Sequence, residues 1–506
     1  MPTASPVASR LAELVGGEHV LTASTVCAEY AVDGLEPQAV LRPGSSSEIA
    51  DILRFAAAER LAVIPMGGRT KLGIGMPPKR FDLALDLSRM TRVLAYDPRD
   101  LTCGVEAGVH FADLNRLLAA ERQFLPLAPA FGTRATLGGI IAAGADSPLR
   151  HAYGSTRDFL LGVEFITGDA VSSKSGGRVV KNVTGYDLHK LLIGSLGTLA
   201  VITRLNFRTF PLPPQQATFV ATFASADAAL AWCAALAKSP LEPKIVEVLD
   251  PGTARLFAPA ATRVPRDGWS VVVTAAGHRA VVDRHARDLA HLASEKHAAE
   301  FVALNDDDGD AEQHALLQCI SEFPNMVLET CPGAAIFRIA VLPSAMPELL
   351  RRVGAVTERD ISQRPAPGDK TPEHKTSERQ TLERQTLHRA TLVRVSGVVY
   401  IALLPTTNNA NEHMNGVASQ STSTSATERV GDLELVQACC GLIDLGIAMG
   451  LRPVIERCPL PVKRALAARG RSIWPPSGAE HVLAERLKKV FDPQEILAPG
   501  RFHGGI

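Results

Sequence analysis

The segment IPMGGRTKLGIG, residues 64–75, follows an apolar run and contains Gly67, Gly68, Gly73 and Gly75. Glycine adopts positive φ at no steric cost and leaves no side chain between the backbone and a ligand. Successive backbone N–H groups that curl in this way form a nest for a phosphate group. The segment has neither the Gly-x-Gly-x-x-Gly fingerprint nor the Gly-Lys-Ser/Thr ending of a P-loop. It therefore predicts an anion-binding loop that differs from the ordinary mononucleotide motifs.

Two further glycine clusters follow in the first two hundred residues. In FGTRATLGGIIAAGA, residues 131–145, Gly138 and Gly139 precede small apolar residues that are typical of a buried helix. Free N–H groups at a helix N-terminus attract anions, so this cluster is a second candidate phosphate contact. In GYDLHKLLIGSLGTLAVIT, residues 185–203, two glycines flank a turn into a strand. A flat ring that stacked there would contact backbone rather than bulky side chains.

The sequence around these glycine clusters predicts an α+β fold. From Val40 to Phe210, short β-rich runs such as LAVIP alternate with helical stretches such as ADILRFAAAERLA, which follows a Ser-rich N-cap region. From Pro211 to Ala448, a strand–helix–strand order repeats, which predicts a sheet covered by helices on one face. Residues 449–506 predict helices and an irregular tail that reaches back to the first domain.

Two polar stretches interrupt the second region. Residues 357–388 contain the repeat ERQTL, and residues 408–428 are rich in Asn, Ser and Thr. Polar, low-complexity segments cannot form a hydrophobic core, so we expect both stretches to be surface insertions without catalytic or binding residues.

Composition excludes several classes of function. Lys and Arg total 53 and Asp and Glu total 53, so no general electrostatic attraction to nucleic acid or anionic lipid is expected. Eight cysteines without a Cys-x-x-Cys spacing predict buried thiols in a reducing cytoplasm, not a disulfide framework or a cysteine-ligated cluster. No signal peptide and no apolar run long enough to span a membrane can be read.

The order of the glycine clusters, with YGSTRDFLLGVEFITGDA between the second and the third, resembles the PCMH-type FAD-binding domain of the vanillyl-alcohol-oxidase superfamily. More narrowly, GGRVVKNVTGYDLHKLLIGSLGTL (176–199) and the tail FDPQEILAPGRF resemble the FAD-binding E subunits of bacterial glycolate oxidase (glycolate dehydrogenase) complexes. The resemblance implies a lead-in at 1–37, a PCMH-type domain of two α+β subdomains at 38–212, an α/β cap at 213–448 and a C-terminal segment at 449–506 that returns to the flavin site.

The resemblance also implies which residues contact FAD. They come from the first loop around the pyrophosphate, the second loop near the flavin and ribityl chain, the Tyr-Gly pair after it, the third cluster and the tail. These residues are Met66, Gly67, Gly68, Arg69, Thr70, Lys71, Gly132, Thr136, Leu137, Gly138, Gly139, Tyr153, Gly154, Gly194, Gly197, Thr198, Ile202 and Arg501. In this scheme Arg501 lies near the isoalloxazine and stabilises the flavin when it is reduced.

Two departures from the wider family change the expected chemistry. Relatives that attach FAD covalently use a histidine in the first loop, and residues 66–71 contain none, so FAD should be bound without a covalent bond. Relatives that oxidise 2-hydroxy acids often carry a His-x-His pair and a Gly-Asp-Gly run for a metal, and neither occurs in this sequence, so no metal site is expected.

Candidates for catalysis are weak. His189, with His110 and His151 as further histidines, could act as a base, although a lone histidine is more often a packing residue. For Tyr186, packing in the core is the favoured interpretation over stacking on the flavin. Lys181 and Asn182 precede the third cluster and could bind a carboxylate. Arg501 completes the set of candidate catalytic residues.

Three functions therefore stay open. The first is an FAD subunit of a glycolate dehydrogenase that oxidises glycolate to glyoxylate, with a paralogous FAD subunit and an iron–sulfur subunit as partners. The second is a stand-alone FAD-linked 2-hydroxy-acid dehydrogenase, and the third is an FAD-holding structural subunit without hydride transfer. The expected location is cytoplasmic, with membrane contact only through partners. Nicotinamide chemistry is disfavoured because no Rossmann fingerprint occurs.

Overall fold

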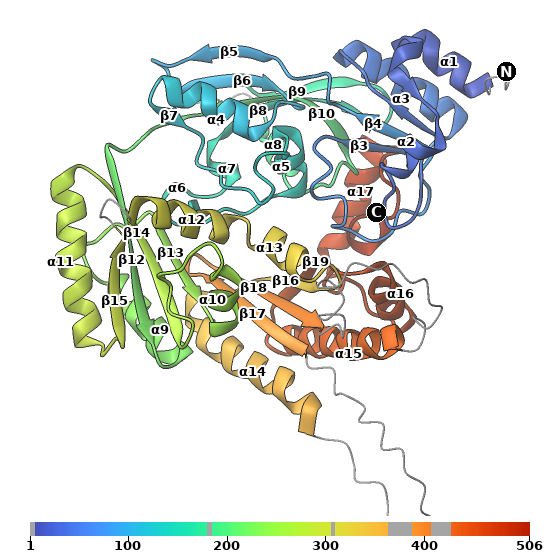
Figure 1. The fold of residues 1–506 in the computed structure, drawn as a ribbon. Helices are drawn as coiled ribbons and strands as arrows, with labels where there is room; N and C mark the ends of the chain where they lie inside the picture. The colour runs from blue at the N-terminus through green and yellow to red at the C-terminus, as the bar shows by residue number, and fades with distance from the viewer. Residues whose placement is uncertain (1–5, 180–184, 305–308, 363–386, 406–426) are drawn as a thin grey trace, which may run out of the picture.

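The computed structural model describes residues 6–179, 185–304, 309–362, 387–405 and 427–506. Most of the two predicted polar insertions, as well as Lys181 and Asn182, lie outside these residues. The described chain forms a first domain, blue to teal in Figure 1, and a cap, green to orange below it. The last helix returns to the first domain (Figure 1).

The first domain holds two larger sheets and a short ribbon. One sheet has the order β1-β2-β4-β3, with parallel pairing of β4 to both β2 and β3, and the other is antiparallel with the order β5-β6-β10-β8-β9. The strands are β1 Val20–Leu21, β2 Ala39–Leu41, β3 Val63–Met66, β4 Leu83–Asp86, β5 Val93–Asp97, β6 Thr102–Glu106, β8 Leu160–Thr167, β9 Ser172–Gly176 and β10 Ala200–Arg208, with β7 Gln123–Phe124 and β11 Phe210–Pro211 in the ribbon. The predicted α+β fold with two subdomains is confirmed.

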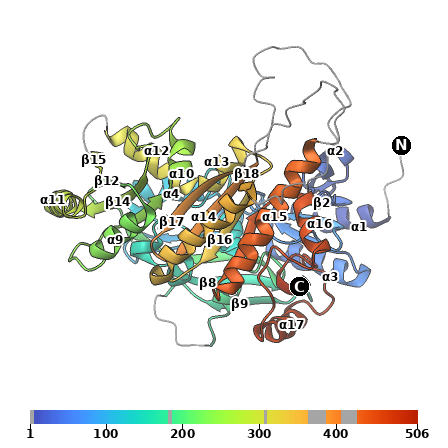
Figure 2. The ribbon, with the colours of Figure 1, turned by 90° about the horizontal axis from the view of Figure 1, so that it is seen from below.

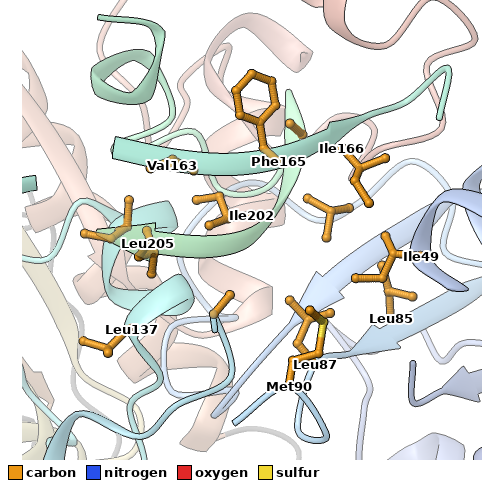
Figure 3. Packing of buried hydrophobic residues seen from close by; sticks show 14 of the residues in the cluster. Ile49, Leu85, Leu87, Met90, Leu137, Val163, Phe165, Ile166, Ile202 and Leu205 are labelled. Carbon is orange, nitrogen blue, oxygen red and sulfur yellow. The ribbon is translucent and has the colours of Figure 1, made fainter. Parts of the chain in front are cut away.

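Helices pack on these sheets through apolar stripes. α3, Ser46–Glu59, begins where the Ser45 side chain accepts the N–H of Glu48, and it buries Ile49, Ile52, Leu53 and Ala56. This i, i+3, i+4, i+7 spacing points one face of the helix into the core, where Ile49 packs beside Leu85 (Figure 3). The other helices of this domain are α1 Pro6–Val15, α2 Ser24–Ala28, α4 Phe111–Ala120, α5 Leu137–Ala143, α6 Arg150–Tyr153, α7 Thr156–Phe159 and α8 Leu188–Leu191.

The cap is built on one eight-stranded antiparallel sheet with the order β15-β12-β14-β13-β17-β18-β16-β19. Its strands are β12 Gln215–Phe223, β13 Ile245–Leu249, β14 Trp269–Gly277, β15 Glu300–Leu304, β16 Ala335–Ala340, β17 Leu387–Arg394, β18 Val398–Pro405 and β19 Arg452–Arg457. Because β19 pairs with β16, the cap sheet includes a strand from the segment that the sequence predicted as helices and tail.

Helices cover both faces of this sheet, so the prediction of one covered face is wrong. On β12, Phe219 and Phe223 face one apolar cluster and Val220 faces the other. A sheet that is buried on both faces has nearly continuous apolar strands, which hides the alternation. The outer face carries α9 Ala226–Leu236, α11 Arg279–Glu295, α14 Met346–Ser362 and α15 Thr427–Ala448, with α14 beside α15 (Figure 2). The inner face carries α10 Pro251–Phe257, α12 Gly309–Ser321 and α13 Phe323–Thr330.

The C-terminal segment returns to the first domain, as the sequence predicted. After α16, Leu460–Ala468, and α17, Glu480–Phe491, the tail runs beside β3. The N–H of Val63 donates to the carbonyl oxygen of Ile496, and the N–H of Ala498 donates to the carbonyl oxygen of Val63. Among the described residues, no helix combines the length and apolar character that crossing a membrane requires.

Candidate functional site

A cavity opens in the first domain, between residues of both sheets. Its walls come from the end of β3 and the glycine loop after it, from α5, from the start of β10 and from the tail. Sequence-predicted site residues that line it are Met66, Gly67, Gly68, Arg69, Thr70, Lys71, Thr136, Gly138, Gly139, Gly197, Ile202 and Arg501. Four segments far apart in the sequence therefore meet at one cavity.

The glycine loop supplies hydrogen-bond donors at this cavity. In the described chain, no recorded hydrogen bond uses the backbone N–H groups from residue 67 to residue 73. A Cβ on Gly67 would overlap the Thr136 side chain, and a Cβ on Gly68 would overlap the carbonyl group of Arg134. Only glycine lets the first loop approach the second this closely. The N–H groups of the loop are therefore available to an anion, as the predicted nest requires.

The N-terminus of α5 does not supply such donors, and this part of the sequence interpretation is wrong. The N–H groups of Leu137 and Gly138 donate to carbonyl oxygens at the end of β6 and in the following turn, and the N–H of Gly139 donates to the Thr136 hydroxyl. The two glycines differ in their surroundings. A Cβ on Gly138 would press on Ala107, whereas a Cβ on Gly139 would meet only the Thr136 hydroxyl. Gly138 is therefore needed for packing, and Gly139 leaves room on the cavity side.

The other predicted contact residues lie away from the cavity. Leu137 is buried in the core, Thr198 donates to Ser195 within a turn, and Gly194 faces Gly144. Gly154 lies at the end of α6, and Tyr153 before it packs edge-on against Phe124 and Phe210.

Gly132 has a different partner. The N–H groups of Phe131 and Gly132 donate to the carboxylate of Glu322, at 2.6 and 3.0 Å. Glu322 lies between α12 and α13 of the cap. This loop therefore binds a carboxylate of the chain itself and helps to hold the cap on the first domain.

The two arginines at the cavity have partners within the protein. The Arg69 guanidinium stacks over the Tyr30 ring at 4.1 Å and donates to the carbonyl oxygen of Glu29, so Arg69 offers backbone rather than charge to the cavity. Arg501 is 3% exposed and donates to the carbonyl oxygens of Leu72 and Ile74. Burial lowers the pKa of Arg501 to about 10.

The predicted catalytic candidates outside the tail do not reach the cavity. His189 is buried on α8 and shares a hydrogen bond of 3.0 Å between Nδ1 and the Ser175 hydroxyl, and burial lowers its pKa. Tyr186 is 90% exposed, so the prediction that it packs in the core is wrong. Neither His110 nor His151 lines the cavity.

Charged side chains of the cap act on Lys71, and the sequence interpretation missed them; Arg457 donates to the carbonyl oxygen of the neighbouring Thr70. Burial lowers the pKa of Lys71, Glu456 opposes this shift, and Arg457, Arg338 and Arg394 add to it. The only available signal was a charged residue inside an otherwise apolar strand, as in the IFRIAV of β16. Such a residue needs a partner when it is buried.

Partners for these charges are present on the same inner face. Arg338 pairs with Glu456 through Nε and Oε1 at 2.9 Å, and it donates to the carbonyl oxygen of Gly144, which ends α5. The phenol of Tyr400 is buried beside Arg338 and Arg394, and burial raises its pKa well above the ordinary value. The inner face of the cap sheet therefore presents a buried ionic cluster at the α5 and Lys71 side of the cavity.

Comparison with known protein families agrees with this architecture. Residues 37–171 match the family model "FAD binding domain", and residues 212–361 match "FAD linked oxidases, C-terminal domain". The two matches have the order that the fold shows, with the FAD-binding domain before the cap. The match to the first model includes β3, the glycine loop after it and α5.

Relatives with curated names share part of the chain. Glycolate oxidase subunit GlcD of Bacillus subtilis is 31% identical over 43% of this chain and 46% of its own length. Glycolate oxidase subunit GlcE of Escherichia coli is 33% identical over 33% of this chain and 48% of its own length. D-2-hydroxyglutarate dehydrogenase of Xanthomonas citri is 35% identical over 37% of this chain and 39% of its own length. The matches thus span half or less of each of these relatives.

Solved structures match the fold over nearly the whole chain. The 4-ethylphenol oxidase of Gulosibacter chungangensis has a TM-score of 0.70 at 16% identity, and the alignment covers 99% of this chain and 98% of that chain. An alkyldihydroxyacetonephosphate synthase has a TM-score of 0.69 at 16% identity, over 98% of this chain and 85% of that chain. At this identity the likeness shows the fold, which is the PCMH-type FAD-binding fold followed by a cap.

The residues at the cavity fit FAD. The glycine loop offers unbonded N–H donors for a pyrophosphate, and the opposite wall offers Ala142, Leu196, Ala200 and Ile202 to an apolar ring. No histidine, cysteine or tyrosine occurs among the residues that line the cavity, so they offer no usual side chain for a covalent flavin bond. In the described parts of the chain, no three His, Cys, Asp or Glu side chains group as metal ligands would.

Proposed function

We propose that the protein is an FAD-dependent oxidoreductase that acts on a small 2-hydroxy acid. The observation that carries this proposal is the set of cap cations beside the cavity that fits FAD, where Arg457 donates to the carbonyl oxygen of Thr70 on the glycine loop and Arg338 donates to the carbonyl oxygen of Gly144 at the end of α5. Guanidinium groups bind carboxylates through paired, charge-assisted hydrogen bonds. A 2-hydroxy acid brings such a carboxylate next to the carbon that is oxidised.

FAD bound in the cavity would supply the acceptor for a hydride, that is two electrons and a proton, from the carbon that carries the hydroxyl. The residues of this chain have other tasks. Arg338 is half-buried and already held by Glu456, so its guanidinium is fixed in direction before an acid arrives. Lys71 is on the glycine loop and Arg338 is on the cap, so both domains contribute basic side chains. The substrate hydroxyl must release a proton, and burial lowers the pKa of Lys71, which favours the neutral amine that can accept it.

We further propose that the protein acts as the FAD-binding subunit of a multi-subunit glycolate oxidase. The support is the likeness to two proteins named as glycolate oxidase subunits, together with the glycine-rich segment 176–199. An iron–sulfur subunit and a second FAD subunit would then accept or share the electrons. A stand-alone 2-hydroxy-acid dehydrogenase is the second candidate, because D-2-hydroxyglutarate and D-lactate dehydrogenases are also among the relatives.

A dye-linked dehydrogenase assay tests the substrate class. Glycolate, D-lactate and D-2-hydroxyglutarate are compared with their methyl esters, which keep the hydroxyl and lose the carboxylate charge. We expect turnover of at least one acid and none of its ester. For that acid, Arg338→Gln should raise KM about tenfold or more, while Arg338→Lys recovers part of the loss. Equal turnover of acid and ester would contradict carboxylate recognition.

Partner dependence separates the two candidates. Affinity purification of the tagged chain from its own cells should recover an iron–sulfur protein and a second flavoprotein if it is a subunit. Full dye-linked activity of the isolated chain, with no co-purified flavoprotein, would favour the stand-alone enzyme.

A further inference from the structure

The carbonyl oxygens of the glycine loop are held by cations from the C-terminal segment. Five residues between 70 and 75 accept hydrogen bonds from three such cations. The pairs are Arg457 with Thr70, Arg501 with Leu72 and Ile74, and Lys463 with Gly73 and Gly75. About 390 to 430 residues separate each cation from its acceptor along the chain.

The direction of these carbonyls sets the direction of the neighbouring N–H groups. In a trans peptide the C=O and the following N–H point in opposite directions. When Arg457 holds the carbonyl of Thr70, the N–H of Lys71 therefore points away from the C-terminal segment. Thr70 and Lys71 both line the cavity. Arg457 thus keeps the polar groups of this peptide apart, with its oxygen toward the C-terminal segment and its donor free for the cavity. The N–H groups of Ile74 and Met76, which follow the carbonyls held by Lys463, donate to the carbonyl oxygens of Lys71 and Arg501, so Lys463 fixes the end of the loop rather than a donor at the cavity.

Lys463 is the most enclosed of the three cations. It lies on α16, is 1% exposed, and its Nζ donates to both carboxylate oxygens of Asp33 at 3.0 and 2.8 Å. The same Nζ donates to the carbonyl oxygens of Gly73 and Gly75 at 2.9 and 2.8 Å. A buried ammonium group is stable only when it is paired in this way. Lys463 does not line the cavity, so it can act on a ligand there only through the loop.

We propose that Lys463 and Arg457 are positioning residues that hold the glycine loop in the conformation that binds the phosphates of the flavin. The proposal rests on the proposed flavin function and adds to it a requirement on two residues far from the loop in sequence. The expected loss of affinity is limited to ligands that carry phosphate. Loss of either cation weakens binding of FAD but leaves binding of riboflavin, which has the ring and ribityl chain without phosphate, unchanged.

The test is a fluorescence titration of the full-length apoprotein with FAD and with riboflavin. For Lys463→Met, we expect the Kd for FAD to rise about tenfold or more, because charged hydrogen bonds to the loop are lost. The Kd for riboflavin should stay within about twofold of the wild-type value. Arg457→Gln should show the same selectivity with a smaller change, and it decides the question if Lys463→Met is insoluble.

Lys488→Met is the matched control. Lys488 is also a buried lysine of the C-terminal segment, 4% exposed, and it donates to Asp492 and to the carbonyl oxygens of Thr198 and Leu497. It has no recorded bond to the glycine loop. We expect it to lower stability without changing the ratio of the two affinities.

Two results would overturn the proposal. One is equal weakening of FAD and riboflavin in the Lys463 and Arg457 variants, which would indicate general loosening of the cavity. The other is unchanged FAD affinity in both variants. If the wild-type apoprotein binds neither ligand, the proposed flavin function itself fails, which is a different outcome.

Discussion

Arg394 on β17 of the cap forms an ion pair of 3.2 Å with Asp146 of the first domain, and each side chain is only 4% exposed. Asp146 also accepts a hydrogen bond of 3.4 Å from the Tyr400 hydroxyl. Asp146 follows the glycine that ends α5 by two residues, so this contact ties the cap to the helix that lines the cavity.

Asp146→Asn should lower the apparent free energy of unfolding by about 3 to 5 kcal/mol, because it leaves the buried Arg394 without its partner across the domains. Denaturation in guanidinium chloride measures the change. Asp113→Asn is the control, since Asp113 pairs with Arg116 on the surface, where an ion pair contributes about 0 to 1 kcal/mol. Equal midpoints for the two variants would contradict a role for the buried pair in holding the cap.

Glu247→Gln should remove a pH dependence of stability. Burial raises the pKa of Glu247 to about 8 from 4.5, although Arg394 opposes the shift. The folded protein therefore keeps a proton that the unfolded chain releases, so this group's contribution is complete below pH 4.5 and is lost as the pH rises to about 8. Between these values the variant should gain stability relative to the wild type, by about 1.4 kcal/mol for each pKa unit at most. Parallel stability curves from pH 5 to pH 8 would show that Glu247 titrates normally.

Gly139→Val should give soluble protein with an ordinary far-UV spectrum and little bound FAD. The added side chain has only the Thr136 hydroxyl nearby, so it enters the cavity rather than the core. Gly138→Ala is the informative comparison, because its Cβ presses on the Ala107 backbone and side chain. That change should lower the thermal midpoint by several degrees through overpacking. Full flavin occupancy in Gly139→Val would place the flavin elsewhere.

FAD should leave the protein on denaturation. The cavity lining contains no histidine, cysteine or tyrosine, and the first loop contains no histidine. Acid precipitation followed by filtration should therefore recover all of the yellow cofactor in the filtrate. Flavin that remains with the precipitated polypeptide would show a covalent bond.

Local sequence predicted the parts of the site that depend on local chemistry. Glycine loops, the strand before the first loop and the helix after Ser45 follow from residues close together in the chain, and the structure contains them. What the sequence could not show are contacts between segments that are distant along the chain. The N–H groups of α5 looked free because the carbonyl acceptors near Ala107 lie some thirty residues earlier.

The ionic residues of the cap were missed for the same reason. Arg338 and Arg394 appear in the sequence as single charges within apolar strands, and only the sheet order brings them to one face. Lys463 lies in a segment that the sequence predicts only as helical, and no neighbouring residue marks it as buried, yet it is 1% exposed in the structure. Tyr186 looked like a core residue beside a glycine cluster, yet the turn exposes it.

The most direct test of the proposed function is anaerobic mixing of the purified, FAD-loaded protein with glycolate, D-lactate or D-2-hydroxyglutarate, with the visible absorbance of the flavin as the readout. The measurement is made on the chain alone and on the chain with its co-purified partners. We predict that at least one acid bleaches the flavin of this chain, and that Arg338→Gln slows the bleaching at a fixed acid concentration. Flavin that stays oxidised with every acid, both alone and with partners, would contradict the proposal and leave an FAD-holding subunit without hydride transfer.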